Sequence, residues 1–334
     1  ITEALMQFHF KFIEPSSVKA DLPDIGEIRN QIKQFLIDRN QPANYLQMNA
    51  LCLKAFYPFL LNSKVLEAGP RGVYQNVQTT VDNILQRGDY WTIYTKGTSE
   101  IENHIWWLSG VNATNPHELT ISDKVERDVL ALISDKVSGV ITFEQVVEYL
   151  YHKHMGLNTP DLVLIRLCLE SYGEGTLTIP QKWQIKQRDI PAIRKLDFED
   201  IVATINKIGK DLGFQTRQGF PIFWDNHSTS SKRYVFYPIT TCMVGQYVFD
   251  DDKNGDYTKI LVLPGSRARL FIYKIGIDPR LEQALDKEWR VIKFRQIRQF
   301  LERENPNLAT WEGLLDLDPI LWDEAIQLNM FDQK

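Results

Sequence analysis

Apolar residues in the first third of the chain recur at helical spacing. Apolar residues that lie three and four positions apart predict helices over residues 25–36, 44–61 and 73–85. The glycine and proline content of residues 67–72 predicts a loop between the last two. We therefore expect residues 1–115 to form a helical region.

Three further helices carry start and stop signals. Ser122 stands at the N-cap position of the first, and Thr142 with Gln145 occupies the two positions of a capping box in the second. The third begins at Thr159, has Pro160 at its first helical position and ends before Gly173. All three segments are therefore predicted as helices.

A hairpin is predicted immediately after the third helix. Leu177 and Ile179 alternate with polar residues before a turn at Pro180, and Trp183 and Ile185 alternate after it. Three helices followed by a hairpin are typical of a winged helix. We assign residues 116–195 to such a domain.

The remaining third reads as an α/β domain over residues 196–334. An amphipathic helix at 197–212 is followed by strand-like runs at 214–224, 233–249 and 259–264, and then by alternating helix and strand signals. This order resembles a degenerate restriction-nuclease core. The expected fold class is a multidomain α+β protein with helical, winged-helix and nuclease-like parts.

Charge narrows the possible functions. The chain has a net charge of −5, so contact with nucleic acid requires a local basic patch.

The three cysteines, Cys52, Cys168 and Cys242, are widely spaced without a CxxC pair, which indicates a reducing compartment. The sequence contains no run of eighteen apolar residues, so no membrane-spanning helix is predicted. We expect a soluble cytoplasmic protein.

A basic block lies in the α/β domain. Residues 257–303 contain 11 Lys and Arg against five Asp and Glu, whereas residues 304–334 contain seven acids and one lysine. Two groups of cations are candidates for binding duplex phosphates: Arg267, Arg269 and Lys274, and then Lys293, Arg295 and Arg298. A solvated face paired with the acidic tail is the alternative interpretation.

The predicted hairpin adds a third basic group. Lys182, Lys186 and Arg188 follow its turn, whereas the third helix offers only Arg166 outward. Reading of the major groove favours Arg, Lys, Asn or Gln at the start of the recognition helix. We therefore expect the third helix to be mostly core. A purely structural winged helix is slightly favoured, and if the domain contacts DNA, we expect it to do so through the hairpin and the backbone.

No catalytic constellation stands out. The central strand KILVLPG has no carboxylate and Asp225 stands alone, so a magnesium-dependent nuclease is the least favoured class. His152 and His154, two apart on a helix, point away from one another and do not indicate a metal site. We predict no metal, no cofactor and no enzymatic activity.

Several segments together resemble the region downstream of the catalytic domain in a group of bacterial DNA methyltransferases. The resembling residues are GVYQNVQTTVDNILQRGDYW (72–91), TPDLVLIRLCLESYG (159–173), WQIKQRD (183–189), VLPGSRARLFIYK (262–274), DPRL (278–281) and VIKFRQIR (291–298). The resemblance implies an accessory region in restriction-modification or phage defence, with the methylation motifs outside this chain.

Three function classes therefore stay open. The first is a non-catalytic DNA-binding or target-positioning region of a DNA methyltransferase, with duplex DNA and a catalytic domain as partners. The second is a protein-interaction scaffold that binds subunits of a defence complex, and the third is the nuclease. A short motif near the end, Gln327, Leu328, Met330 and Phe331, also resembles the peptide that docks on the bacterial sliding clamp.

Overall fold

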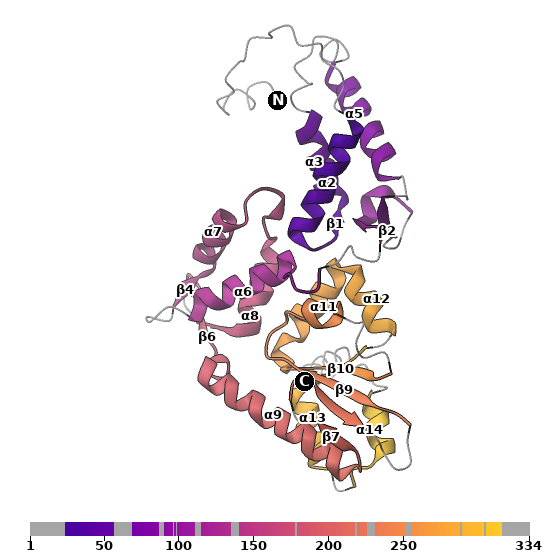
Figure 1. Cartoon of the computed structure of the whole chain (residues 1–334). Helices are drawn as coiled ribbons and strands as arrows, with labels where there is room; N and C mark the ends of the chain where they lie inside the picture. Colours follow the sequence, from indigo (N-terminus) through magenta and orange to yellow (C-terminus); the bar gives the residue numbers. More distant parts are fainter. Residues whose placement is uncertain are drawn as a thin grey trace, which may run out of the picture.

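A computed structural model gives the chain a mixed α+β fold (Figure 1). It describes residues 24–56, 69–86, 90–95, 97, 99–110, 115–134, 140–177, 179–217, 219–225, 231–250, 256–287, 289–303 and 305–315. We refer below to an N-terminal unit (24–110), a middle unit (115–190) and a C-terminal unit (191–315). The predicted clamp motif at 327–331 lies outside the described residues.

The N-terminal unit combines helices with a small sheet. Its elements are α2 (Ile25–Arg39), β1 (Ala43–Asn44), α3 (Tyr45–Phe56), α5 (Gly69–Leu85), β2 (Trp91–Thr95), the 3-10 turn η2 (Ile101–Asn103) and β3 (His104–Leu108). The strands pair antiparallel in the order β1-β3-β2. The prediction of a purely helical region was therefore incomplete. The predicted loop was also wrong from residue 69 onward, because a proline is tolerated in the first turn of a helix, where Pro70 lies.

Two neighbouring tryptophans on β3 face different parts of the molecule. Trp106 packs against Tyr45 of α3, with ring centroids 6.0 Å apart. Trp107 instead lies beneath the guanidinium of Arg280, 4.0 Å from the ring centroid, and so contacts the C-terminal unit. Successive residues of a strand point to opposite faces, so β3 joins the core of its own unit to its neighbour.

The middle unit begins with helices and ends in a hairpin. Its elements are α6 (Ile121–Ser134), β4 (Ile141–Thr142), α7 (Phe143–Lys153), η3 (Gly156–Asn158), α8 (Leu162–Tyr172), β5 (Gly173–Gly175), β6 (Lys182–Ile185) and η4 (Gln187–Asp189). The strands pair antiparallel in the order β4-β6-β5. The capping box of Thr142 and Gln145 is present. Helix α8 starts later than predicted, because Asp161 caps it by accepting from the Leu164 N–H at 2.7 Å.

The predicted alternation in the first arm of the hairpin was wrong. Strand β5 ends at Gly175, and the side chains of Leu177 and Ile179 are fully exposed. Between the strands, the Thr176 N–H donates to the Lys182 carbonyl at 2.7 Å and closes the base of the loop. The apolar residues of this arm therefore form the tip of the hairpin and take no part in the core.

The C-terminal unit is built on a five-stranded sheet. The strands β7 (Gln215–Arg217), β8 (Ile222–Asp225), β9 (Tyr234–Pro238), β10 (Thr258–Leu263) and β11 (Trp289–Lys293) lie in sequence order across it. Strands β9, β10 and β11 are parallel, and β8 is antiparallel to both of its neighbours. In the run predicted as a strand up to residue 249, the strand ends at Pro238, and the short helix α10 (Gly245–Val248) follows after a six-residue connection.

Helices cover both faces of this sheet. One face carries α9 (Pro191–Asp211), α13 (Phe294–Leu301) and α14 (Leu308–Leu315). The other carries α10 (Gly245–Val248), the 3-10 turn η5 (Gly265–Arg267), α11 (Ala268–Ile277) and α12 (Pro279–Lys287). Strand β10 serves both, since Ile260 and Val262 face the first layer and Leu261 and Leu263 face the second.

The core is continuous between the middle and C-terminal units. A single cluster of buried residues contains Leu169 of α8, Phe271 of α11 and Leu261 of β10. Helix α9 also starts at Pro191 and so crosses the boundary predicted at residue 195. Packing thus holds these two units together. No helix in the described ranges combines the length and apolar character needed to cross a membrane.

Candidate functional site

Arg267, predicted to bind phosphate, lies inside the protein. It ends the turn η5 after β10 and is only 1% exposed. Its Nε donates to the Thr240 carbonyl at 3.1 Å, its Nη1 to the Ser171 carbonyl, and its Nη2 to the Asp189 carboxylate. The guanidinium also stacks on the Tyr172 ring, 3.6 Å from the centroid. Arg267 therefore joins the middle unit to the C-terminal unit.

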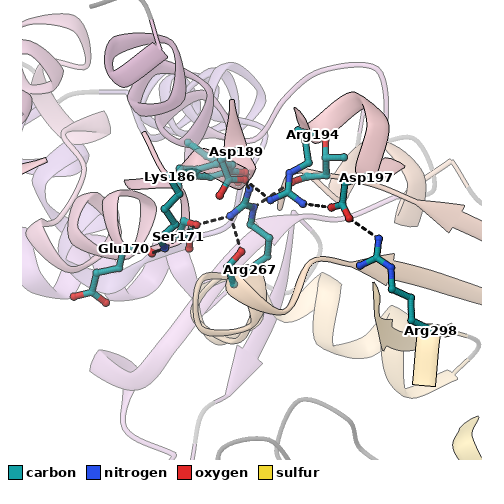
Figure 2. A network of polar contacts seen from close by, with 12 residues as sticks. Glu170, Ser171, Lys186, Asp189, Arg194, Asp197, Arg267 and Arg298 are labelled. Atoms are coloured by element: carbon teal, nitrogen blue, oxygen red, sulfur yellow. Dashed lines mark hydrogen bonds and ion pairs between the residues drawn. The ribbon is translucent and has the colours of Figure 1, made fainter. Parts of the chain in front are cut away.

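The pair of Arg267 and Asp189 is part of a longer polar network, shown in Figure 2. Asp189 also accepts from Arg194 at 2.6 Å, and Arg194 continues to Asp197. Arg298 of α13 then donates to Asp197 at 2.5 Å. The network runs from the end of the middle unit along the start of α9 to α13.

Lys186 belongs to the same network. Its ammonium group donates to the carbonyls of Glu170 and, at 3.3 Å, Ser171, at the end of α8. Burial lowers the pKa of Lys186 to about 8, and the positive charge of Arg188 adds to this effect. The side chain is therefore used to close the C-terminus of α8, where unpaired carbonyls favour a cation.

Lys274, the third member of the first predicted group, is also buried. It donates to Asp123 and Glu126 of α6 and, at 3.1 Å, to the Cys242 carbonyl. Burial disfavours its charge, but the two carboxylates more than offset this and raise the pKa of Lys274. The prediction of phosphate contacts by Arg267 and Lys274 was therefore wrong, because internal carboxylates already neutralise both.

The second predicted group is divided. Lys293 precedes α13, where its backbone N–H donates to the Gln296 side chain at 2.9 Å. The residue is buried, so its assignment to a phosphate surface was also wrong. Arg298 is half-buried between Asp197 and Asp200, and its contact with Asp200 is 2.8 Å. Only Arg295 is exposed. The structure does not bring the three side chains to one open surface.

The remaining predicted cations lie on the surface. Arg269 is 70% exposed and pairs with Glu170 of α8 at 3.0 Å. Lys182 and Arg188 are exposed on and just beyond β6. An ion pair at this exposure contributes little to stability, so Arg269 can exchange Glu170 for another partner at little cost.

Sequence reasoning missed the acids that hold the buried cations. Asp123 and Glu126 lie on α6 at the spacing of one helix face, and Leu130 and Ile133 continue that face into the core. This shared stripe was the available signal, because acids on an apolar stripe are expected to have buried partners. Burial raises the pKa of Asp123, which its contact with Lys274 opposes.

A third link joins the N-terminal unit to α12. Arg280 makes a two-point contact with Asp278, through Nη2 at 2.6 Å and Nε at 2.9 Å. It also donates to the Asn40 carbonyl at 2.9 Å and lies between the rings of Trp107 and Phe249. Each of the three units is therefore tied to another by a buried cation.

Asp225, the acid considered for a nuclease site, has two polar partners. Arg217 pairs with it at 2.6 Å, and the Tyr257 hydroxyl donates to it at 2.6 Å. Among the residues that the structure describes, no group of three or more His, Cys, Asp or Glu side chains is arranged to hold a metal. Asp225 therefore acts as the partner of an arginine in the geometry described.

Exposed apolar side chains stand at two places in the middle unit, the start of α8 and the tip of the hairpin. Leu162 and Val163 in the first turn of α8 are 48% and 56% exposed, and Leu177 and Ile179 form the hairpin tip. The other side of α8 packs on α11, where Tyr273 donates to Asp161. The prediction that α8 is mostly core therefore holds for most of the helix, but its start is an exposed apolar surface.

Comparison with known proteins gave no match to any family model, curated protein or solved structure.

Proposed function

We propose that this chain is a non-catalytic docking module, in which a winged helix presents the start of its third helix and its hairpin tip to a partner protein. The element order α6, β4, α7, α8, β5, β6 supports the winged-helix assignment. The strand order β4-β6-β5 supports it as well, because the hairpin then pairs with the short strand that follows the first helix.

The C-terminal unit is proposed to be a nuclease-like core that lacks a metal site. Its mixed sheet of five strands in sequence order, covered by helices on both faces, supports this comparison. Strand β9 supplies only aromatic and apolar side chains and a proline, and they are buried. We propose that this unit supports the winged helix mechanically through α11.

The observation that carries the proposal is the contrast between buried cations and exposed apolar residues. Arg267 and Lys274 are neutralised inside the protein, whereas Leu177 and Ile179 are fully exposed. A surface that binds phosphates requires accessible cations, whereas protein interfaces are built around apolar anchors. The hairpin tip and the start of α8 fit the second requirement.

The partner class follows from the resemblance to methyltransferase accessory regions. We propose that a methyltransferase catalytic domain, or a subunit of a defence complex, docks on Leu162, Val163, Leu177 and Ile179. Exposed apolar side chains at these two places are typical of an interaction site. Duplex DNA would then be held by the partner, and this chain would position it.

Site-specific photocrosslinking tests this proposal. A photoreactive amino acid at Leu177 should give a discrete crosslink to the purified methyltransferase catalytic domain, and the same amino acid at exposed Glu199 on α9 should not. The variant Leu177→Ser with Ile179→Ser should weaken binding to that domain at least tenfold. Equal crosslinking at both positions, or unchanged affinity, would contradict the proposal.

Direct contact with DNA through the hairpin is the second candidate. Lys182 at the start of β6, next to the tip, and Arg188 just beyond the end of β6 are both exposed, which favours it. Two phosphate contacts would give weak binding that falls with salt at a slope of roughly −2 on logarithmic axes. Charge reversal at both residues should then abolish the salt dependence, and an unchanged slope would exclude this candidate.

A further inference from the structure

Arg39 is a buried cation with two side-chain donors that have no hydrogen-bond partner among the described residues. It lies in the last turn of α2, is 5% exposed, and rests on the Phe35 ring at 5.1 Å. Over the described ranges, neither its Nε nor its Nη1 has a hydrogen-bond partner. Burial lowers its pKa to about 10, which leaves it charged at neutral pH. Buried donors of a charged group without hydrogen bonds are unfavourable, so Nε and Nη1 lack an acceptor.

The nearest carboxylate does not supply that acceptor. Asp278 acts on Arg39 electrostatically, but both of its oxygens accept from Arg280, at 2.9 Å and 2.6 Å. Arg280 adds a second positive charge that also acts on Arg39. Two guanidinium groups therefore share one carboxylate at this junction of the N-terminal unit and α12.

A second unused donor lies at the same junction. The indole N–H of Trp107 is buried without a hydrogen-bond partner, and its ring lies 4.0 Å below Arg280. Arg280 also binds the carbonyl of Asn40, the residue that follows Arg39. The junction thus has unused donors on Arg39 and Trp107, and two guanidinium groups beside one carboxylate.

We propose that this junction binds an oxyanion, a phosphate or carboxylate group, through the Arg39 guanidinium. The planar fork of an arginine matches two oxygens of either group. Because Arg39 is almost buried, the ligand is a small anion or the terminal group of a larger molecule. Its binding would tie the end of α2 more firmly to α12, so that the junction responds to an anion. The proposal is independent of the docking function.

Thermal unfolding of the full chain tests it at constant ionic strength. Inorganic phosphate and acetate are titrated separately against chloride, which distinguishes a phosphate from a carboxylate ligand. We expect a saturable rise in Tm of several degrees with one of them, and loss of that rise in Arg39→Gln. The matched control is Arg127→Gln, an arginine whose side chain is 53% exposed on α6, which should keep the rise.

Two outcomes overturn the proposal. One is the absence of a saturable rise with either anion, and the other is an equal rise in the wild-type chain and in Arg39→Gln. The variant Arg39→Met should fold at least as well as the wild type without anion, since it removes an uncompensated charge. If neither variant folds, calorimetry of the wild type decides: a single saturable site supports the proposal, and no heat of binding overturns it.

Discussion

Arg267 and Asp189, 78 positions apart in the sequence, form an ion pair in which both side chains are 1% exposed. The pair joins the turn after β10 to the segment between the middle unit and α9. The cations expected to hold an external polyanion therefore stabilise the contact between two parts of the protein.

Removing this arginine should be costly. In Arg267→Met, Asp189 stays buried with only Arg194 as a charged partner, and the loss expected for a broken buried pair is about 3 to 5 kcal/mol of unfolding free energy. Arg269→Ala removes an exposed arginine two positions further along, in α11, and should cost less than about 1 kcal/mol. Urea denaturation measures both. Similar losses of unfolding free energy in the two variants would show that burial of Arg267 contributes nothing to stability.

Lys274 and Glu126 should be coupled energetically. Lys274→Met leaves two carboxylates buried without a cation, whereas adding Glu126→Gln removes one of them. The double variant should therefore be more stable than the sum of the two single losses predicts, by at least about 1 kcal/mol. A double-mutant cycle measured by urea denaturation gives this value. Additivity within about 0.5 kcal/mol would mean that the contact is not energetically important.

Stability should depend on pH through Lys186. Its pKa is about 8 in the folded chain and 10.5 ordinarily, so between these values the unfolded chain keeps a proton that the folded chain has lost. The unfolding free energy contributed by this group therefore rises as the pH increases through that window. The unfolding free energy of the wild type, minus that of Lys186→Met, should therefore increase from pH 7.5 to pH 9.5. A constant difference, measured by urea denaturation at both ends, would contradict the assignment.

The three thiols should be unreactive in the native state. Cys52, Cys168 and Cys242 are buried, and burial raises the pKa of each thiol, that of Cys52 to about 12. Reaction requires the thiolate, so a disulfide reagent at pH 8 should modify none of them before unfolding and all three in urea. Rapid native labelling of any one would place it on an accessible surface.

Local signals in the sequence predicted local structure well. The capping box at Thr142 lies where expected, because it depends on residues within one helical turn. The α+β fold class follows from the same kind of periodicity. The predicted start of α8 was wrong by two residues, because the N-cap is Asp161 and not Thr159.

The candidate site was not predictable in the same way. Counting charges along residues 257–303 detects an excess of cations but not the acids that face them, and Lys274 meets Asp123 across 151 positions. Which partner a buried charge finds is decided by how α11 packs on the middle unit. The stripe of Asp123 and Glu126 with apolar residues on α6 was the one local indication of that contact.

Binding of the purified chain to a labelled DNA duplex tests the central claim most directly. Fluorescence anisotropy is measured from 50 to 200 mM salt on the wild type and on Arg269→Glu with Arg295→Glu, the two exposed members of the basic groups predicted at 267–274 and 293–298. Because the other members of these two groups are neutralised internally or by neighbouring acids, we predict no binding that depends on Arg269 and Arg295 at any salt concentration. Binding that falls steeply with salt and disappears in the double variant would contradict the account.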